Sequence, residues 1–155
     1  MSRLIIIEGP DGAGKTKLAK LLANTFNLNY VHGTYKDPAT FEWFMEQFKR
    51  GGIIDRTFIS EEIYSRVLGR ECRIGHEDAD KLTSYLLENE AIIFHCTASD
   101  LILKSRAFSR GEDYVNEEQL EKISQLYKYY FKISALNVLM VEVALSTITL
   151  KSLED

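Results

Sequence analysis

The sequence predicts an α/β fold of three layers, in which a parallel sheet of about five strands is flanked by helices. Short apolar runs of strand length alternate with helical segments along the 155 residues. Strands that alternate with helices in this way form a parallel sheet covered on both faces. The first run, Leu4–Ile7, is wholly apolar, as is typical of a strand buried on both sides. A glycine-rich turn then joins this run to a helix.

The first half of the chain is expected to contain three strands, each followed by a helix. The helix after the first strand places Leu18, Leu22 and Phe26 at helical spacing. Asp37 and Pro38 supply an N-cap and a first-turn proline for the next helix. The expected strands are Leu4–Ile7, 28–35 and 51–56, and the expected helices cover 15–26, 37–48 and 59–68, the last ending at Gly69.

The second half continues the alternation. Ser99 is a suitable N-cap, and Asn116 with Gln119 resembles a capping box at the start of a long helix. The expected helices are 77–88, 99–109 and 116–131, the expected strands are 91–96 and 137–143, and a short helical tail follows. Because the chain contains no repeat or linker, we expect a single domain over 1–155.

Composition narrows the class of protein. Hydrophobic residues make up 45% and charged residues 27%, which is ordinary for a soluble globular chain. The formal net charge of −4 provides no broad basic surface, so nucleic acid is not expected as a partner. Apolar runs are of strand length, so no membrane span is expected. Cys72 and Cys96 are predicted to be reduced thiols in a cytoplasmic protein. A homodimer is left open.

The segment "EGPDGAGKTKLA" carries the strongest functional signal. Its spacing of Gly9, Gly14, Lys15 and Thr16 fits the phosphate-binding loop G-x-x-x-x-G-K-[ST]. Glycines let backbone N–H groups approach phosphate oxygens, and the helix N-terminus adds its positive dipole end. Lys15 would neutralise the β- and γ-phosphates, and Thr16 would hold magnesium. We therefore expect ATP and Mg²⁺ as cofactors, bound by Gly9, Pro10, Asp11, Gly12, Ala13, Gly14, Lys15 and Thr16.

This loop, together with "DRTFISEEIY", resembles thymidylate kinase and related deoxynucleoside monophosphate kinases of the P-loop kinase family, in a short, phage-like form. Asp55, Arg56, Ser60 and Tyr64 stand at the family's Asp-Arg, serine and aromatic positions. The segment 106–130 resembles the family's arginine-bearing lid and the helix after it. The resemblance implies a P-loop NTPase fold with a lid around 106–116. It also implies phosphoryl transfer to a deoxynucleoside monophosphate, such as dTMP or a dUMP analogue, with Asp11 at the sugar hydroxyl.

Several residues then receive expected roles. Arg56 would bind the acceptor monophosphate through two parallel hydrogen bonds. Asp55 would orient that arginine or hold magnesium-bound water, so Thr16 and Asp55 are the candidate metal residues. Ser60 and Tyr64, one helical turn apart, would border the base or sugar.

The aromatic residues of 41–48 are divided between the core and the acceptor site. Phe41 and Phe48 are expected in the core, whereas Phe44 or Trp43 would stack on the base. The family's Arg-Glu-Pro segment, whose arginine contacts the base, has no counterpart, because no arginine lies between Arg3 and Arg50. The base is therefore open between thymine, uracil, a modified pyrimidine and another base.

Five later arginines have two interpretations each. Arg106 and Arg110 share a helix face, where they either close over the transferring phosphoryl group or form a solvated basic face. One of Arg66, Arg70 and Arg73 could reach the acceptor pocket, and at least two of the three are expected on the surface.

Three other functions are weighed against the monophosphate kinase. A nucleoside kinase needs a carboxylate base for a neutral 5′-hydroxyl, and Asp37 is the candidate. A kinase of a hydroxymethylated base within DNA is disfavoured by the acidic charge balance. A non-catalytic nucleotide-binding module would be expected to show a switch segment and a purine-selective N-K-x-D-like motif, and neither is visible.

Overall fold

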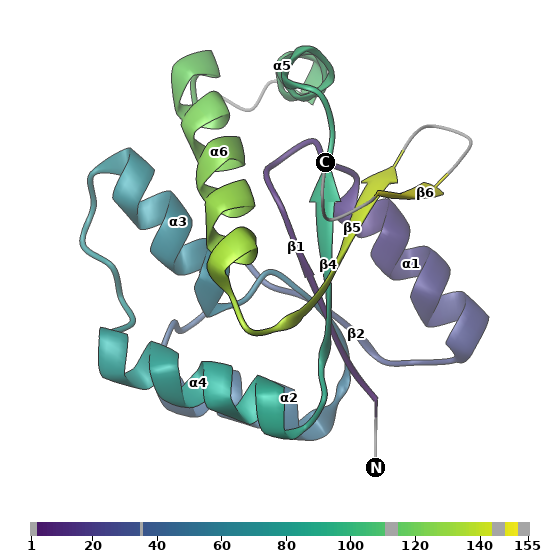
Figure 1. Cartoon of the computed structure of the whole chain (residues 1–155), viewed down its shortest axis with the longest axis vertical. Coiled ribbons are helices and arrows are strands. Elements are labelled where there is room, and N and C mark those ends of the chain that lie inside the picture. Colours follow the sequence, from purple (N-terminus) through teal and green to yellow (C-terminus); the bar gives the residue numbers. More distant parts are fainter. Residues whose placement is uncertain (1–2, 35, 111–114, 144–147, 152–155) are drawn as a thin grey trace.

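In the computed structural model, which describes residues 3–34, 36–110, 115–143 and 148–151, the chain forms one six-stranded sheet between helices (Figure 1). The strands follow the order β2-β3-β1-β4-β5-β6, and the first five are parallel. Their bounds are β1 Leu4–Glu8, β2 Tyr30–His32, β3 Gly52–Asp55, β4 Ile92–Thr97, β5 Asn137–Val143 and β6 Ile148–Lys151. The predicted parallel five-stranded sheet is confirmed.

The expected helical tail is wrong for the residues that form β6. This strand runs antiparallel to β5, with Val143 opposite Ile148 and Met140 opposite Lys151. The open edge of β5 offers unpaired backbone N–H and C=O groups, and a returning strand satisfies them. The alternation of helices and strands in the sequence does not predict this antiparallel strand.

Within the described residues, six helices flank the sheet. Their bounds are α1 Lys15–Phe26, α2 Phe41–Arg50, α3 Phe58–Leu68, α4 His76–Glu88, α5 Asp100–Arg110 and α6 Glu117–Ile133. The capping box at the start of α6 is confirmed, since Asn116 and Gln119 exchange side-chain hydrogen bonds with each other's backbone.

The start predicted for α2 is wrong by several residues. Thr40 is the N-cap, and its hydroxyl accepts a hydrogen bond from the backbone N–H of Trp43 at 3.2 Å. The carboxylate of Asp37 instead accepts from the backbone N–H of Thr34 at 2.7 Å. Asp37 therefore closes a turn in the loop between β2 and α2, which is one wall of the cleft described below.

The alternation of side chains along β1 divides the core into two halves. Leu4 and Ile6 face helices α2, α3, α4 and α6, whereas Ile5 and Ile7 face the side where α1 and α5 pack. Figure 1 shows α1 on one side of the sheet and the α2, α3, α4 and α6 group on the other. Burial on both faces is what the apolar run predicted, and it fixes β1 at the centre of the sheet.

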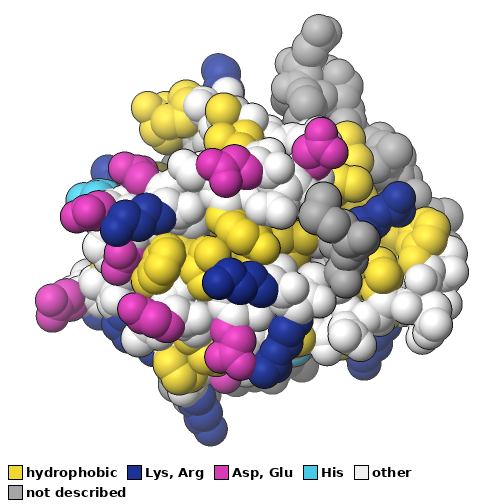
Figure 2. All heavy atoms as spheres, turned by 90° about the horizontal axis from the view of Figure 1, so that it is seen from below, with side chains coloured by type: hydrophobic (Ala, Val, Ile, Leu, Met, Phe, Trp, Pro, Cys, Tyr) yellow, Lys and Arg dark blue, Asp and Glu magenta, His cyan; other side chains and the backbone are white. Residues whose placement is uncertain are grey.

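The outer surface is mixed in charge. Figure 2, seen from below the view of Figure 1, shows Lys and Arg interspersed with Asp and Glu around hydrophobic side chains. Within the described parts of the chain, none of the helices has the length and apolar character needed to cross a membrane. Cys72 and Cys96 are both free thiols.

Candidate phosphate-binding cleft

The carboxyl ends of the parallel strands open onto a cleft of about 900 Å³. Ligands of open α/β sheets bind at this edge, where loops from neighbouring strands meet. The loop after β1, the loop after β2, and helices α2 and α3 form its walls. The sequence-predicted residues that line it are Asp11, Gly12, Gly14, Lys15, Thr16, Phe44, Arg56, Ser60 and Tyr64.

The glycine-rich loop has the backbone that its sequence predicts. A Cβ on Gly9 would lie 2.4 Å from the carbonyl oxygen of Cys96, and one on Gly14 would lie 2.7 Å from the Val143 side chain. Gly14 also has a φ of 87°, a left-handed conformation that glycine adopts without strain. Gly9, Pro10 and Ala13 are buried and shape the loop from beneath.

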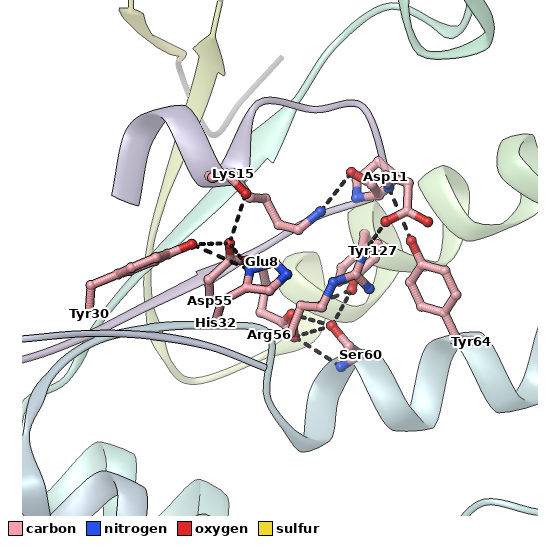
Figure 3. Close-up of polar contacts among 12 residues, drawn as sticks. Glu8, Asp11, Lys15, Tyr30, His32, Asp55, Arg56, Ser60, Tyr64 and Tyr127 are labelled. Carbon is pink, nitrogen blue, oxygen red and sulfur yellow. Dashed lines mark hydrogen bonds and ion pairs between the residues drawn. The ribbon is translucent and has the colours of Figure 1, made fainter. Parts of the chain in front are cut away.

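Lys15 begins α1 and is held along this loop. Its Nζ donates to the carbonyl oxygen of Pro10 at 3.0 Å, and only 6% of the residue is exposed. The ammonium group therefore lies over the loop rather than in solvent (Figure 3). A cation above a ring of backbone N–H groups, next to a helix N-terminus, is suited to bind a polyphosphate.

Next to Lys15, the side chains of two strand ends converge on a buried carboxylate. Asp55 Oδ2 accepts from His32 Nδ1 at 3.0 Å, Tyr30 Oη at 3.2 Å and Thr16 Oγ1 at 3.4 Å (Figure 3). Burial and the nearby Asp55 charge raise the pKa of Tyr30 to about 12, so its hydroxyl stays a donor. Asp55 Oδ1 is buried without a hydrogen-bond partner in the described part of the chain.

The oxygen atoms of Thr16 and Asp55 are suited to bind magnesium. The ion prefers oxygen ligands and keeps several waters, and here a Thr16 hydroxyl on the cleft wall is backed by a carboxylate with an unused oxygen. Asp55 is fully buried, so it would act behind Thr16, through water.

Arg56 follows β3 and reaches across the cleft to the phosphate loop. Its guanidinium forms an ion pair with Asp11, and its Cζ lies 5.2 Å from the centroid of the Tyr64 ring (Figure 3). The Tyr64 hydroxyl in turn accepts from the backbone N–H of Asp11 at 3.0 Å. Arg56 has a φ of 75°, a strained conformation for a non-glycine residue that is concentrated at functional sites.

Ser60 lines the cleft, but its hydroxyl also contacts buried residues beneath it. Its backbone N–H and its Oγ both donate to the fully buried carboxylate of Glu8, and its Oγ lies 2.9 Å from the hydroxyl of Tyr127. Burial raises the pKa of Glu8 to about 7, although the hydrogen bond from Ser60 and the charges of Arg56 and Lys15 oppose this rise. Glu8 therefore ties the first turn of α3 to the end of β1.

Arg106 lies against the phosphate loop rather than in solvent. Its Nη1 donates to the carbonyl oxygen of Gly12 at 2.7 Å, and its Nη2 donates to that of Val143 at 3.1 Å. The solvated-face interpretation is therefore wrong for Arg106. Arg110 is in α5, but its side chain and residues 111–114 of the predicted lid lie outside the described residues.

The lining of the cleft also includes aromatic and charged side chains from α2, α3 and the loop after α3. Trp43 and Phe44 pack edge to face, with ring centroids 5.2 Å apart. Glu61, Arg70 and Arg73 also line the cleft. All three arginines after Tyr64 are exposed, which confirms the surface expected for at least two of them. Arg70 and Arg73, rather than a single arginine, also line the cleft, and Arg66 does not.

Sequence reasoning missed four contributors to this site: Glu8, His32, Glu61 and the second of the two cleft arginines. His32 had a usable signal, because it ends β2 in register with Asp55 at the end of β3. Glu8 had a weaker one, as the single charged residue that closes an apolar strand. The contacts of Glu61 depend on a chain reversal at Gly69 that has no periodic signature.

Comparison with solved structures identifies the fold. The chain is similar to the YorR protein of Bacillus subtilis in complex with phosphorylated GDP, with a TM-score of 0.76 and 22% identity over 88% of this chain and 84% of that one. It is similar to a deoxyadenosine kinase of M. mycoides with bound dATP, with a TM-score of 0.61 and 18% identity over 90% of each chain. A gluconokinase of Sinorhizobium meliloti 1021 has a TM-score of 0.53 and 13% identity over 92% of this chain and 83% of that one.

No known family and no curated protein matches the sequence. The named kinases among these structures share the P-loop fold, and the chain has that fold. These similarities do not confirm a thymidylate kinase-like assignment.

Proposed function

We propose that the protein catalyses ATP- and magnesium-dependent phosphoryl transfer to a deoxynucleoside monophosphate, with a pyrimidine such as dTMP or dUMP as the first candidate acceptor. The observation that carries the proposal is the position of Arg56, a strained arginine held in the same cleft as Lys15 and the phosphate loop. One cation is thereby available for the donor phosphates and a second for an acceptor phosphate.

The reaction needs little covalent chemistry from the protein. An oxygen of the acceptor monophosphate attacks the γ-phosphorus of ATP, the bond from that phosphorus to the β–γ bridging oxygen breaks, and ADP leaves with the electron pair. The acceptor is already an anion, so no proton needs to be removed. Catalysis then rests on positioning and on neutralising the charge of the transferring group.

Each residue of the cleft has a part in this scheme. Lys15 and the backbone N–H groups of residues 12–16 hold the ATP phosphates, and Arg106, next to Gly12, completes the positive surroundings. Arg110 is assigned to the same closing element from the sequence alone. Thr16, backed by Asp55, holds magnesium, which when bound would neutralise the β- and γ-phosphate oxygens.

The acceptor lies on the other side of the cleft in this proposal. The guanidinium of Arg56 leaves Asp11 to bind the acceptor phosphate, and the freed Asp11 carboxylate accepts from the sugar hydroxyl. The Tyr64 ring borders the sugar, and Phe44 with Trp43 covers the base. Ser60 contributes mainly by fixing the start of α3 through Glu8.

A nucleoside kinase is the second candidate, because two of the similar solved structures are deoxyadenosine kinases with bound dATP and dCTP. The sequence predicts Asp37 as the general base of a nucleoside kinase, and Asp37 lines the cleft. Its carboxylate is committed to the backbone N–H of Thr34 and is also 3.4 Å from the hydroxyl of that residue. This engagement disfavours Asp37 as a base for a 5′-hydroxyl.

A coupled ADP-release assay with ATP, magnesium and a panel of acceptors tests the proposal. The panel contains the five common deoxynucleoside monophosphates and the matching nucleosides. Turnover with monophosphates is expected. Turnover with nucleosides alone would replace the proposal with the second candidate, and ATP binding without turnover of any acceptor would leave a nucleotide-binding module.

A further inference from the structure

The cleft contains a second cationic cluster, formed by Arg70 and Arg73, that the proposed phosphate sites do not use. The Glu61 carboxylate, on the first turn of α3, is only 5% exposed and is held by two arginines. Its Oε1 accepts from Arg70 Nη1 at 2.7 Å and from Arg73 Nε at 3.1 Å. Its Oε2 accepts from Arg70 Nη2 at 3.2 Å and from Arg73 Nη2 at 2.9 Å. Both guanidinium groups therefore form forks on a single carboxylate.

A reversal of the chain places both arginines there. Gly69 ends α3 in a left-handed conformation with a φ of 69°. The backbone N–H of Arg70 then donates to the carbonyl oxygen of Ser65 at 3.1 Å, so the loop folds back along the helix. Arg73 also donates from Nη1 to the carbonyl oxygen of Asp37 at 3.2 Å, which ties this loop to the opposite wall of the cleft.

The cluster has the chemistry of a recognition site rather than of a simple ion pair. Two guanidinium groups against one carboxylate leave one net positive charge in the cleft. A fork on Glu61 uses two of the five N–H groups of the Arg70 guanidinium. Both arginines are partly exposed, at 38% and 40% of their side chains, so they are accessible from the cleft that they line.

Arginine only donates hydrogen bonds, so it accommodates an oxygen and leaves an amino group without a partner. The same cleft also has an apolar lining, from the rings of Trp43 and Phe44 and from Leu68. A ligand suited to both features has a planar apolar body with carbonyl oxygens at its edge.

We propose that Arg70 and Arg73, positioned by Glu61, recognise the carbonyl oxygen at C4 of a pyrimidine or C6 of a purine, where cytosine and adenine carry an amino group. The enzyme would thereby select keto bases over amino bases. This inference rests on the proposed function, and it adds the class of base: thymine, uracil or guanine rather than cytosine or adenine. Pyrimidine and purine keto bases share the recognised oxygen, so the assay must separate them.

The test compares kcat/KM for dTMP, dUMP, dGMP, dCMP and dAMP in the wild-type protein and in Arg70→Ala and Arg73→Ala. The wild type is expected to prefer the keto base of each matched pair by about tenfold or more, as a good arginine–base contact provides. At least one variant is expected to bring that ratio close to one. Arg66→Ala, which removes an exposed arginine of α3 outside the cleft, is the matched control and is expected to keep the ratio.

A uniform loss with every acceptor in both arginine variants would overturn the inference, because it would indicate phosphate binding or a structural role. Equal use of keto and amino bases by the wild type would overturn it too. A preference for dGMP over dTMP would support it while refuting the pyrimidine part of the proposed function.

Binding provides a readout that does not depend on turnover. Trp43 is the single tryptophan of the chain and lines the cleft, so its fluorescence reports occupancy there. Titration with thymidine and with deoxycytidine is expected to give tighter binding of thymidine, and Arg70→Ala or Arg73→Ala is expected to remove the difference. Should no monophosphate be turned over, this titration still decides the inference, and equal affinities would refute it.

Discussion

Arg56 and Asp11 form an ion pair that joins the end of β3 to the phosphate loop after β1. The contact leaves the arginine side chain 21% exposed and the aspartate side chain 7% exposed. Both groups must exchange this partner for the acceptor if the proposed function is right. The pair then serves as a stand-in for the substrate, because the phosphate replaces the carboxylate on the guanidinium and the sugar hydroxyl replaces the guanidinium on the carboxylate.

Replacing Arg56 with lysine tests whether the fork of this guanidinium matters. Arg56→Lys keeps the positive charge but loses bidentate binding, so kcat/KM should fall about 10²-fold. The loss should be the same for every accepted base, because the phosphate is common to all of them. Steady-state kinetics over the acceptor panel measures it, with Arg66→Lys, at an exposed arginine of α3 outside the cleft, as the control. A base-dependent loss would place Arg56 at the base instead.

Lys15 offers a sharper test of the phosphate loop. Its ammonium group contacts the Pro10 carbonyl oxygen, and it would move from there to the ATP phosphates. Lys15→Ala is expected to lower kcat by about 10²- to 10³-fold, as loss of one charge-stabilising group does. The circular dichroism spectrum should be unchanged. Lys20→Ala removes an exposed lysine of the same helix and should retain activity. Full activity in Lys15→Ala would remove this loop from the mechanism.

The parts of the site that local sequence defines were predictable, and the parts that tertiary contacts define were not. The phosphate loop needs glycine, lysine and threonine at fixed spacing, so the residues around Lys15 could be named in advance. The position of Arg56 followed from a strand end next to that loop. Glu61 lies nine and twelve residues from its arginine partners, across the reversal at Gly69, and no spacing rule joins them.

The fold shows the same division. The five parallel strands were predicted, and β1 and β3, which are buried along their whole length, are visible as apolar runs. The partly exposed β2 covers only Tyr30–His32 of the 28–35 expected. β6 was missed because it is an antiparallel edge strand beside β5, and nothing in the helix–strand alternation required such a strand. The start of α2 was misplaced because both Asp37 and Thr40 are good caps, and only tertiary packing decides between them.

Glu8 should make the stability of the fold depend on pH. Its pKa rises from 4.5 to about 7 on burial, so the folded chain holds a proton that the unfolded chain has lost. The free energy of unfolding should therefore fall as the pH rises from 4.5 to 7, by about 3 kcal/mol from this group. Glu8→Gln is neutral throughout and should lack this component.

Urea unfolding at several pH values measures the difference between wild type and Glu8→Gln, which isolates the contribution of Glu8. Glu77→Gln, which changes an exposed carboxylate of α4, is the control and should keep the wild-type pH dependence. A difference between wild type and Glu8→Gln that does not change with pH would show that Glu8 titrates in the folded chain as it does in the unfolded one.

Glu61 should act in the opposite direction. Burial alone would raise its pKa, but hydrogen bonds from Arg73 and Arg70 outweigh this effect and lower the pKa to about 2. Its contribution to stability is therefore present above pH 4.5 and is lost as the pH falls towards 2. Both arginines are partly exposed, so solvent weakens their effect on Glu61. We expect the free energy of unfolding of wild type to exceed that of Glu61→Gln by about 2 kcal/mol near pH 6. The difference should shrink on acidification.

Glu46→Gln, which breaks only the exposed pair with Arg50, is the control and should show little difference from wild type at any pH. Equal stability of wild type and Glu61→Gln near pH 6 would mean that the two forks do not hold the carboxylate in solution, and the base-recognition cluster would lose its anchor.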